Sequence, residues 1–399
     1  METRKFTRLQ AQVLSACFIV YFCAYIGRLN LSASLDSIMK EMNVLETVGG
    51  TLQTVFAVVY AAGQFVFGAL VDRLSPKKMI LTGLLGSALA NALFSLADSF
   101  TALCILWAFN GAFQSMLWTP IVRLIAAHFS GKRRDRASFT MSFTLAGGNL
   151  AAWGLAVQIQ KWFGWRQAFL IPCFVLIGAA AIAFFMMPNI DKGENTEKKN
   201  LKEISENKKA PVRFLFTTGL LFILFASVTN GFLRDGVITW GPTILGMEKG
   251  MFTLIIPLIN LFGILAGATI VRAFNSRVRA IAGFMMAACL IPSALLFALR
   301  GSAVWAMALM LGLMSAILYG SNTLFTVLMP MEYDKSGRVG LVAGLIDSFI
   351  YVGSALAGTL TGFMRESTGS WTGVYGVWMI VSVIGAACMF LSVKKSEKL

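Results

Sequence analysis

Histidine and charged residues are scarce in this sequence of 399 residues. It has a single histidine, His128, and charged residues make up 13% of the chain, whereas soluble domains carry about 25%. The six cysteines all fall in apolar segments, and none has metal-ligand spacing. His128 is followed five places later by Arg133, so the His-x4-Asp pattern of acyltransferases is absent. We therefore expect no metal, no cofactor and no enzyme.

Apolar residues are abundant instead. They make up 57% of the chain, and the mean hydropathy is +0.73. Apolar segments of about 20 residues recur from end to end, and each could cross a lipid bilayer as a helix. The pattern predicts an all-α polytopic membrane protein with twelve transmembrane helices, near residues 11–37, 46–72, 77–97, 100–129, 137–161, 166–188, 213–242, 249–272, 278–299, 302–330, 338–364 and 372–393.

The net charge of +15 is distributed unevenly between the two sides of the predicted helices. Of the 34 lysines and arginines, 25 fall on the side of the termini and the middle loop, and six fall in the alternate loops. This asymmetry is the positive-inside bias of membrane proteins. It predicts that both termini are cytoplasmic, and it argues against binding to nucleic acid. The short loops favour a bacterial inner membrane.

The polar segment 189–212 divides the chain into two halves of six predicted spans each. It is rich in lysine and glutamate and has no apolar period, which is typical of a solvated linker. We expect an N-terminal bundle at 1–188, a cytoplasmic linker at 189–212 and a C-terminal bundle at 213–399. Similar Gly-Ala-to-Arg stretches follow the second and the eighth spans, at Gly68 and Gly267. The two bundles should therefore be pseudo-symmetric, an architecture common in transporters, here in a monomer.

A conformational gating motif is predicted at the first of these stretches. It comprises Gly68, Asp72, Arg73 and Lys77, in a tight turn between two spans. Asp72 can stabilise the positive N-terminus of a neighbouring helix, or it can pair with a basic residue of the other half in one conformational state. The alternative is that the charges only fix the topology, which explains Lys77 but not the spacing of the glycine and the aspartate.

Three arginines lie inside predicted spans, and two of them, Arg28 and Arg234, occupy matching places in the two halves. Arg28 follows Ala24-Tyr25-Ile26-Gly27, and Arg234 lies in the seventh span. A charge inside a membrane is costly, so it marks a functional site by default. The planar guanidinium group suits an anion that it can hold with two hydrogen bonds. We expect Arg28 and Arg234 to bind one small organic anion between the halves; the alternative is a structural pair such as Arg234 with Asp235, although adjacent helical side chains point apart.

Other polar and aromatic side chains in the spans are candidates for the same site. Asp347 is an acid within the eleventh span, and it either couples transport to a proton, since burial disfavours its charged form, or neutralises an arginine. Arg123 either lines the pore or lies near the cytoplasmic end of the fourth span. The remaining candidates for substrate binding, each of which could instead serve helix packing, are Tyr60, Gln64, Trp118, Asn149, Trp240 and Tyr319.

These motifs resemble those of the major facilitator superfamily over essentially the whole chain. Within it, several stretches are similar to the organophosphate:phosphate antiporters, which carry glycerol phosphate and hexose phosphate. They are Tyr25-Ile-Gly-Arg28-Leu-Asn30, Phe232-Leu-Arg234-Asp-Gly236-Val-Ile-Thr-Trp240-Gly-Pro242-Thr, Gln114-Ser-Met-Leu-Trp118-Thr-Pro120-Ile-Val-Arg123 and Leu318-Tyr319-Gly320. The resemblance implies two six-helix bundles that rock about the membrane midplane, and phosphate binding by Arg28 and Arg234.

The sequence also departs from that family at defined positions. Gln64 stands where the family usually has a binding-site lysine, Gly147 stands near the place of its fifth-helix histidine, and Asp347 replaces a small residue. The site therefore has less positive charge than a typical phosphate carrier. The first-helix motif also resembles that of sugar-acid symporters, whose usual acid before the arginine is Gly27 here.

The sequence as a whole predicts a secondary active transporter of a small organic anion, most simply a phosphorylated metabolite, that works by alternating access. The coupled ion would be inorganic phosphate or a proton. One alternative is a symporter of a sugar acid or another carboxylate with a proton. An alternative from another class is a membrane sensor that binds an organic anion without transporting it.

Overall fold

The computed structural model describes residues 6–70, 74–188, 219–246, 252, 254–260, 262–263, 277–299, 303–333 and 339–396, and the regular structure in them is helical. The first group of helices comprises α1 (Arg8–Met42), α2 (Glu46–Leu70), α3 (Pro76–Leu96), α4 (Phe100–Gln114), α5 (Trp118–His128), α6 (Gly131–Phe163) and α7 (Gln167–Met186). The second comprises α10 (Leu220–Leu245), α13 (Val278–Ala288), α14 (Leu290–Ala298), α15 (Val304–Thr323), the π-helix η2 (Leu324–Leu328), α16 (Met329–Met331), α17 (Val339–Thr368) and α18 (Trp371–Ser396).

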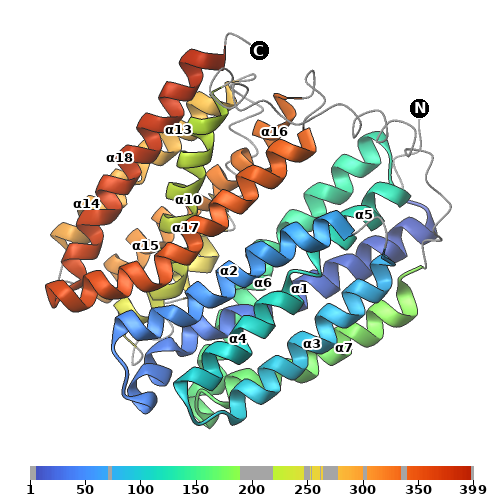
Figure 1. Cartoon of the computed structure of the whole chain (residues 1–399), viewed down its shortest axis with the longest axis horizontal. Helices are drawn as coiled ribbons and strands as arrows, with labels where there is room; N and C mark the ends of the chain where they lie inside the picture. Colours follow the sequence, from blue (N-terminus) through green and yellow to red (C-terminus); the bar gives the residue numbers. More distant parts are fainter. Residues whose placement is uncertain are drawn as a thin grey trace.

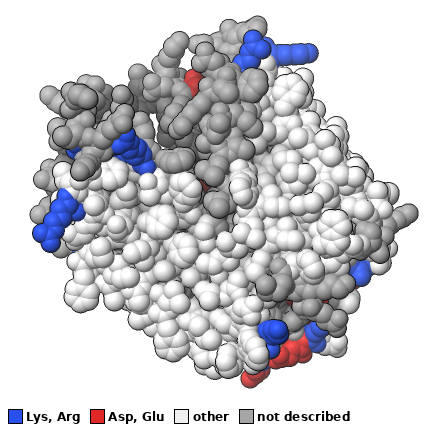
Figure 2. All heavy atoms as spheres, turned by 180° about the vertical axis from the view of Figure 1, so that it is seen from behind, with Lys and Arg blue, Asp and Glu red and all other residues white. Residues whose placement is uncertain are grey.

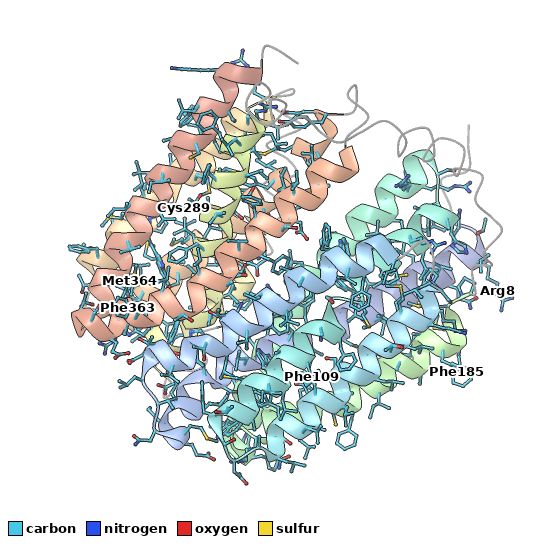
Figure 3. The ribbon with its side chains drawn as sticks, viewed as in Figure 1. Arg8, Phe109, Phe185, Cys289, Phe363 and Met364 are labelled. Carbon is cyan, nitrogen blue, oxygen red and sulfur yellow. The ribbon has the colours of Figure 1, made fainter. Side chains whose placement is uncertain are left out.

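The two groups form two bundles that lie side by side (Figure 1). Ten helical segments of the described residues are long and apolar enough to cross a membrane. Large apolar side chains such as Phe109, Phe185 and Phe363 are more than half exposed on the outside of the bundles (Figure 3). Figure 2 shows a broad uncharged face between charged side chains at the two ends. This surface fits a lipid environment, in which the backbone must satisfy its own hydrogen bonds as helices.

The all-helical, two-bundle prediction is therefore confirmed, with local differences. The fourth span is divided at residues 115–117 into α4 and α5, and the ninth is divided at Cys289 into α13 and α14. The tenth contains the π-helical turn η2. The predicted linker 189–212 and most of the predicted eighth span, 249–272, lie outside the described residues.

A buried polar network fixes the middle of α1. The amides of Asn91 and Asn110 both donate to the carbonyl oxygen of Gly27, at 3.0 and 2.9 Å, and Gln114 donates to the carbonyl of Ala24 at 3.1 Å. Asn30 donates to the side-chain oxygen of Asn91 at 2.9 Å. Hydrogen bonds to amides are costly to lose in a buried setting, so this network holds α1 against α3 and α4 at one rotation.

That rotation also depends on the absence of a side chain at residue 27. A Cβ atom on Gly27 would lie 2.6 Å from a methyl carbon of Leu176 on α7. α1 and α7 are therefore close at this point, and a side chain at residue 27 would require the flexible end of Leu176 to shift. The acid that sugar-acid symporters place before their arginine would meet the same methyl group.

The contact between the bundles is tight at one end of α2 and α17. The backbones of Gly50 and Gly358 touch, and a Cβ atom on Gly358 would lie 2.7 Å from the hydroxyl of Thr54. That hydroxyl donates to the carbonyl of Ala355 at 2.6 Å. At the rim, the hydroxyl of Thr47 donates to Glu366 at 2.5 Å. Small residues and short polar contacts thus join the two halves at the end that carries the α1–α2 and α17–α18 connections.

At the opposite end, each of the same two helices has a glycine that faces open space. Cβ atoms built on Gly68 of α2 and Gly344 of α17 would meet nothing within 4 Å. Lys77 of the predicted gating motif lies 5.1 Å from the ring centroid of Phe184, within the N-terminal bundle. Asp72 and Arg73 lie outside the described residues. Among the described residues, the α2–α17 contact is therefore tight near Gly50 and Gly358, and no such close contact occurs at Gly68 and Gly344.

This asymmetry predicts opposite effects of one substitution at two glycines of α17. Gly358→Ala should lower the free energy of unfolding by about 1–3 kcal/mol, the usual cost of overpacking, because the methyl group would meet the backbone of α2. Gly344→Ala faces open space and gains only helix propensity, so it should be neutral or slightly stabilising. Thermal unfolding of the purified protein in one detergent measures both. Equal shifts of the melting temperature would contradict the packed interface.

Candidate functional site

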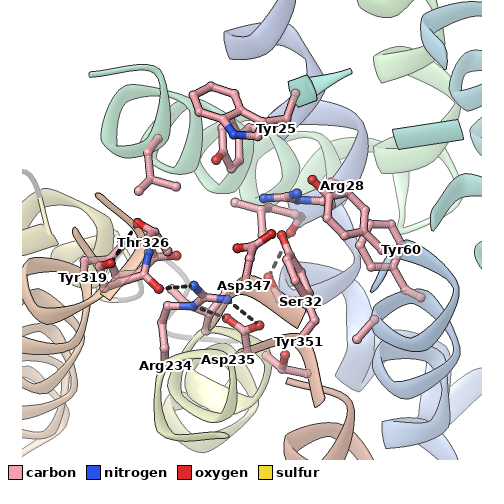
Figure 4. Close-up of a pocket in the computed structure, with 18 of the residues that line it drawn as sticks. Tyr25, Arg28, Ser32, Tyr60, Arg234, Asp235, Tyr319, Thr326, Asp347 and Tyr351 are labelled. Carbon is pink, nitrogen blue, oxygen red and sulfur yellow. Dashed lines mark hydrogen bonds and ion pairs between the residues drawn. The ribbon is translucent and has the colours of Figure 1, made fainter. Parts of the chain in front are cut away.

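A cavity of about 230 Å³ lies between the two bundles, about halfway along the helices. This is less than the roughly 300–1,000 Å³ of pockets for drug-sized ligands, so it suits a small molecule. Side chains of both halves line it (Figure 4). Those with polar groups are Tyr21, Tyr25, Arg28, Ser32, Gln53, Tyr60, Gln64, Trp118, Thr144, Arg234, Asp235, Thr239, Tyr319, Asn322, Thr323, Thr326, Asp347 and Tyr351.

Arg28 enters the cavity from α1 without a polar partner. Within the described residues it has no hydrogen bond or ion pair, and its guanidinium carbon lies 4.6 and 5.6 Å from the ring centroids of Tyr25 and Tyr60. These cation–π contacts stabilise the charge and leave the N–H donors available. Gly148 makes room for this arrangement, since a Cβ atom there would lie 2.7 Å from the ring of Tyr25.

Tyr60, Gln64 and Trp118 line the N-terminal side of the cavity, where the sequence placed them. The amide of Gln64 donates to the hydroxyl of Tyr60 at 2.8 Å and accepts a hydrogen bond from Thr119 at 3.1 Å. Trp118 packs on Tyr21, with their ring centroids 4.8 Å apart. Gln64 therefore holds Tyr60 against Arg28 and adds no charge of its own.

Arg234 enters from α10 and makes four hydrogen bonds to described side chains. Its Nε and one terminal nitrogen donate to the two carboxylate oxygens of Asp235 at 2.7 and 3.0 Å. The other terminal nitrogen donates to Asn322 at 2.8 Å. The terminal nitrogen that binds Asp235 also donates to the hydroxyl of Ser354 at 3.4 Å. The argument that adjacent helical side chains point apart was wrong here, because the long arginine side chain folds back onto its neighbour.

Asp347 of α17 lines the same cavity and points into it in Figure 4. No hydrogen bond or ion pair involves its carboxylate in the part of the chain described. One turn further along α17, Tyr351 packs on Tyr60 of α2, with ring centroids 4.7 Å apart. This ring pair joins the halves next to the cavity.

Two predicted binding residues and Arg123 lie away from the cavity. Asn149 is buried behind it and donates to the hydroxyl of Tyr319 at 3.1 Å. Trp240 is fully buried and donates to the carbonyl of Ala357 at 3.3 Å, in the packed end of the interface. Arg123, in the middle of α5, donates to the carbonyl of Leu74 at 3.1 Å. Asn149 can thus orient Tyr319, whereas Trp240 is part of the core.

Several lining residues were not predicted, although their spacing contains the signal. Tyr21 and Tyr25 lie seven and three places before Arg28 along one face of α1, and Ser32 lies four places after it. Asn322, Thr323 and Thr326 lie three, four and seven places after Tyr319. Residues three and four apart share a helix face. A search for polar residues at helical spacing from each arginine and tyrosine would have found both sets.

Known proteins of similar sequence are named as carriers of phosphorylated compounds. The chain is 27% identical over 418 residues to the glycerol-3-phosphate transporter of Bacillus subtilis strain 168, covering 97% of this chain and 92% of that protein. It is 26% identical over 400 residues to the phosphoglycerate transporter protein of Salmonella typhimurium, covering 92% and 86%. The predicted resemblance to organophosphate carriers is confirmed at this level.

A solved structure and a family model agree on the fold. A bacterial homologue of the human lysosomal transporter Spinster, in an inward-facing and occupied conformation, superposes with a TM-score of 0.75 at 15% identity, covering 98% of both chains. The model of the Major Facilitator Superfamily matches residues 17–338. The match spans both bundles and both cavity arginines. The chain therefore belongs to the Major Facilitator Superfamily and is an integral membrane transporter, not an enzyme.

Proposed function

We propose that this protein is a secondary active transporter of a small organic anion, most simply a phosphorylated metabolite, and that Arg28 and Arg234 bind the anion. The observation that carries the proposal is the guanidinium group of Arg28, which has no hydrogen bond or ion pair to any described residue and lies in a cavity between the two halves. A charge held there without a carboxylate is costly, and an anionic ligand would offset that cost. The names of the two relatives support a phosphate ester as that ligand.

The arrangement of the halves supports alternating access as the mechanism of this proposal. The two arginines enter the cavity from opposite bundles, so one anion between them can draw the bundles together. The α2–α17 interface is packed at the end of Thr47 and Glu366 and open near Gly68 and Gly344. With both termini cytoplasmic in a bacterial inner membrane, as the charge bias indicates, the described conformation faces inward.

A second candidate is proton-coupled symport of a carboxylate such as a sugar acid. It is favoured by Asp347, an acid in the cavity without a hydrogen bond or ion pair among the described residues. An unpaired buried carboxylate binds a proton readily, and release of that proton on the cytoplasmic side would drive uptake. Exchange for inorganic phosphate, as in the antiporters that the sequence resembles, needs no such acid.

A sensor would also use an anion-binding cavity, and counterflow separates the two functions. Purified protein is reconstituted in vesicles loaded with unlabelled glycerol 3-phosphate, and uptake of the labelled compound is followed. A transporter exchanges the two pools, whereas a sensor binds the ligand without exchange. We expect exchange, and binding without any counterflow would refute transport of that ligand.

Replacement of either arginine by lysine should impair the exchange. Lysine keeps the charge and lacks the planar fork that binds an anion with two hydrogen bonds. Loss of one charge-assisted hydrogen bond, worth about 1.5–3 kcal/mol, should lower the rate or affinity roughly 10–100-fold. Initial rates of glycerol 3-phosphate exchange in proteoliposomes measure the effect for Arg28→Lys and Arg234→Lys. Arg8→Lys, at the exposed start of α1, is the matched control, and full activity of both cavity variants would contradict the clamp.

Replacement of Asp347 by asparagine should abolish accumulation that is driven by a pH gradient alone, because asparagine cannot take up a proton. Vesicles with an alkaline interior and no internal phosphate provide that gradient. Asp36→Asn, which removes an acid paired with Lys40 outside the cavity, should accumulate substrate like the unmodified protein. If accumulation needs internal phosphate and ignores the pH gradient, the coupled ion is phosphate and Asp347 is not the coupling residue.

A further inference from the structure

The two cavity arginines differ in what they already bind. The guanidinium of Arg234 shares two hydrogen bonds with the carboxylate of Asp235, and both side chains are largely buried, at 12% and 13% exposure. This paired edge is the one that an arginine would otherwise offer to a carboxylate or phosphate. Arg28 contacts only aromatic faces. An anion in the cavity would therefore contact Arg28, which has no ion pair among the described residues, and Arg234, which is already paired with Asp235.

Two further donors of Arg234 are also directed to the protein. One terminal nitrogen donates to Asn322 at 2.8 Å, and Ser354 accepts at 3.4 Å. A substrate can replace the neutral Asn322 at small electrostatic cost. If the substrate displaced Asp235 from Arg234, the Asp235 carboxylate would remain in a largely buried position without its cation, which is strongly unfavourable. The pair with Asp235 should therefore persist when the substrate binds.

The net charge of the cavity lining also indicates that the site suits an anion with a single negative charge. The charged lining side chains are Arg28, Arg234, Asp235 and Asp347. Their formal charges cancel when both acids are ionised, and one positive charge remains when Asp347 carries a proton. Two positive charges would require that Asp235 be neutral as well. An anion with one negative charge is matched by this site, and a dianion is not.

We propose that Asp235 is a specificity-determining residue that restricts the transported anion to a single negative charge. This inference rests on the proposed function and names the charge class of its substrate: a carboxylate, a sulfonate, a phosphodiester, or a phosphate monoester that keeps one proton. The second pKa of a phosphate monoester is about 6, so such a substrate would bind as its minor form at neutral pH. Asp235 acts by holding Arg234, and it is a positioning residue for that guanidinium.

The test compares anions that differ in charge and little else. Binding to purified full-length protein is measured by titration calorimetry at pH 8, with glycerol 3-phosphate as the dianion and its methyl diester as the monoanion. Sulfate and methyl sulfate form a second pair that lacks the glycerol group. The unmodified protein should bind the monoanion of each pair at least about fivefold more tightly than the dianion.

Removal of the counter-ion should reverse this preference. In Asp235→Asn the ratio of dianion to monoanion affinity should rise about tenfold or more, because Arg234 then offers its bidentate edge to the ligand. Asp235→Glu keeps the charge and should keep the preference for monoanions. If Asp235→Asn does not fold, Asp235→Ser removes the same charge, and a defect that is only structural would weaken both anions alike without changing their ratio.

Two controls distinguish the effect of the Arg234–Asp235 ion pair from the effect of the net charge of the cavity. Asp347→Asn removes one negative charge from the same cavity and leaves Arg234 paired, so its ratio should change much less; an equal change would overturn the proposal. Asp36→Asn, outside the cavity, should not change the ratio. Anion binding with an unchanged ratio in Asp235→Asn refutes this inference alone, whereas absence of binding by all four anions to the unmodified protein refutes the proposed function and the inference together.

Discussion

One guanidinium group without an ion pair among the described residues is the constraint on which the site depends. The charge of Arg28 lies against the faces of Tyr25 and Tyr60, and no carboxylate of the described part of its own bundle pairs with it. The packing behind α1 serves the same end. Asn91 and Asn110 bind the Gly27 carbonyl and set the helix rotation that points Arg28 into the cavity. A polar network buried within the N-terminal bundle thus fixes a charge at its surface.

In the C-terminal half, the charge of the cavity arginine is compensated in a different way. Arg234 has its own counter-ion in Asp235 and further acceptors in Asn322 and Ser354. The pseudo-symmetry of the chain therefore extends to the placement of the arginines and not to their electrostatics. One half presents a free cation, and the other presents a neutral pair with a few adjustable polar contacts. This difference lets the cavity bind an anion without holding two uncompensated positive charges when it is empty.

The contacts between the bundles explain how such a site can open on one side. Gly50 and Gly358 let α2 and α17 touch through their backbones at one end, and a Cβ atom built on Gly68 or Gly344 would meet no described atom within 4 Å at the other. The ring pair of Tyr60 and Tyr351 lies between these regions and borders the cavity. Movement about this middle contact would change both ends together, and the aromatic residues that hold Arg28 lie at its centre.

The sequence by itself determined the membrane fold, the division into two halves and the two arginines, because hydropathy, charge asymmetry and an intramembrane charge are local properties. Tyr60, Gln64, Trp118, Tyr319 and Asp347 were placed at the cavity from their positions in apolar spans, and the structure lines it with all five. Only the tertiary structure separated Trp240, which fills the core, from these residues. It also decided that Arg234 pairs with Asp235, whereas Arg28 pairs with no described residue. Side-chain rotamers and the approach of a second bundle set those contacts. Neither is encoded in the spacing of residues along one helix.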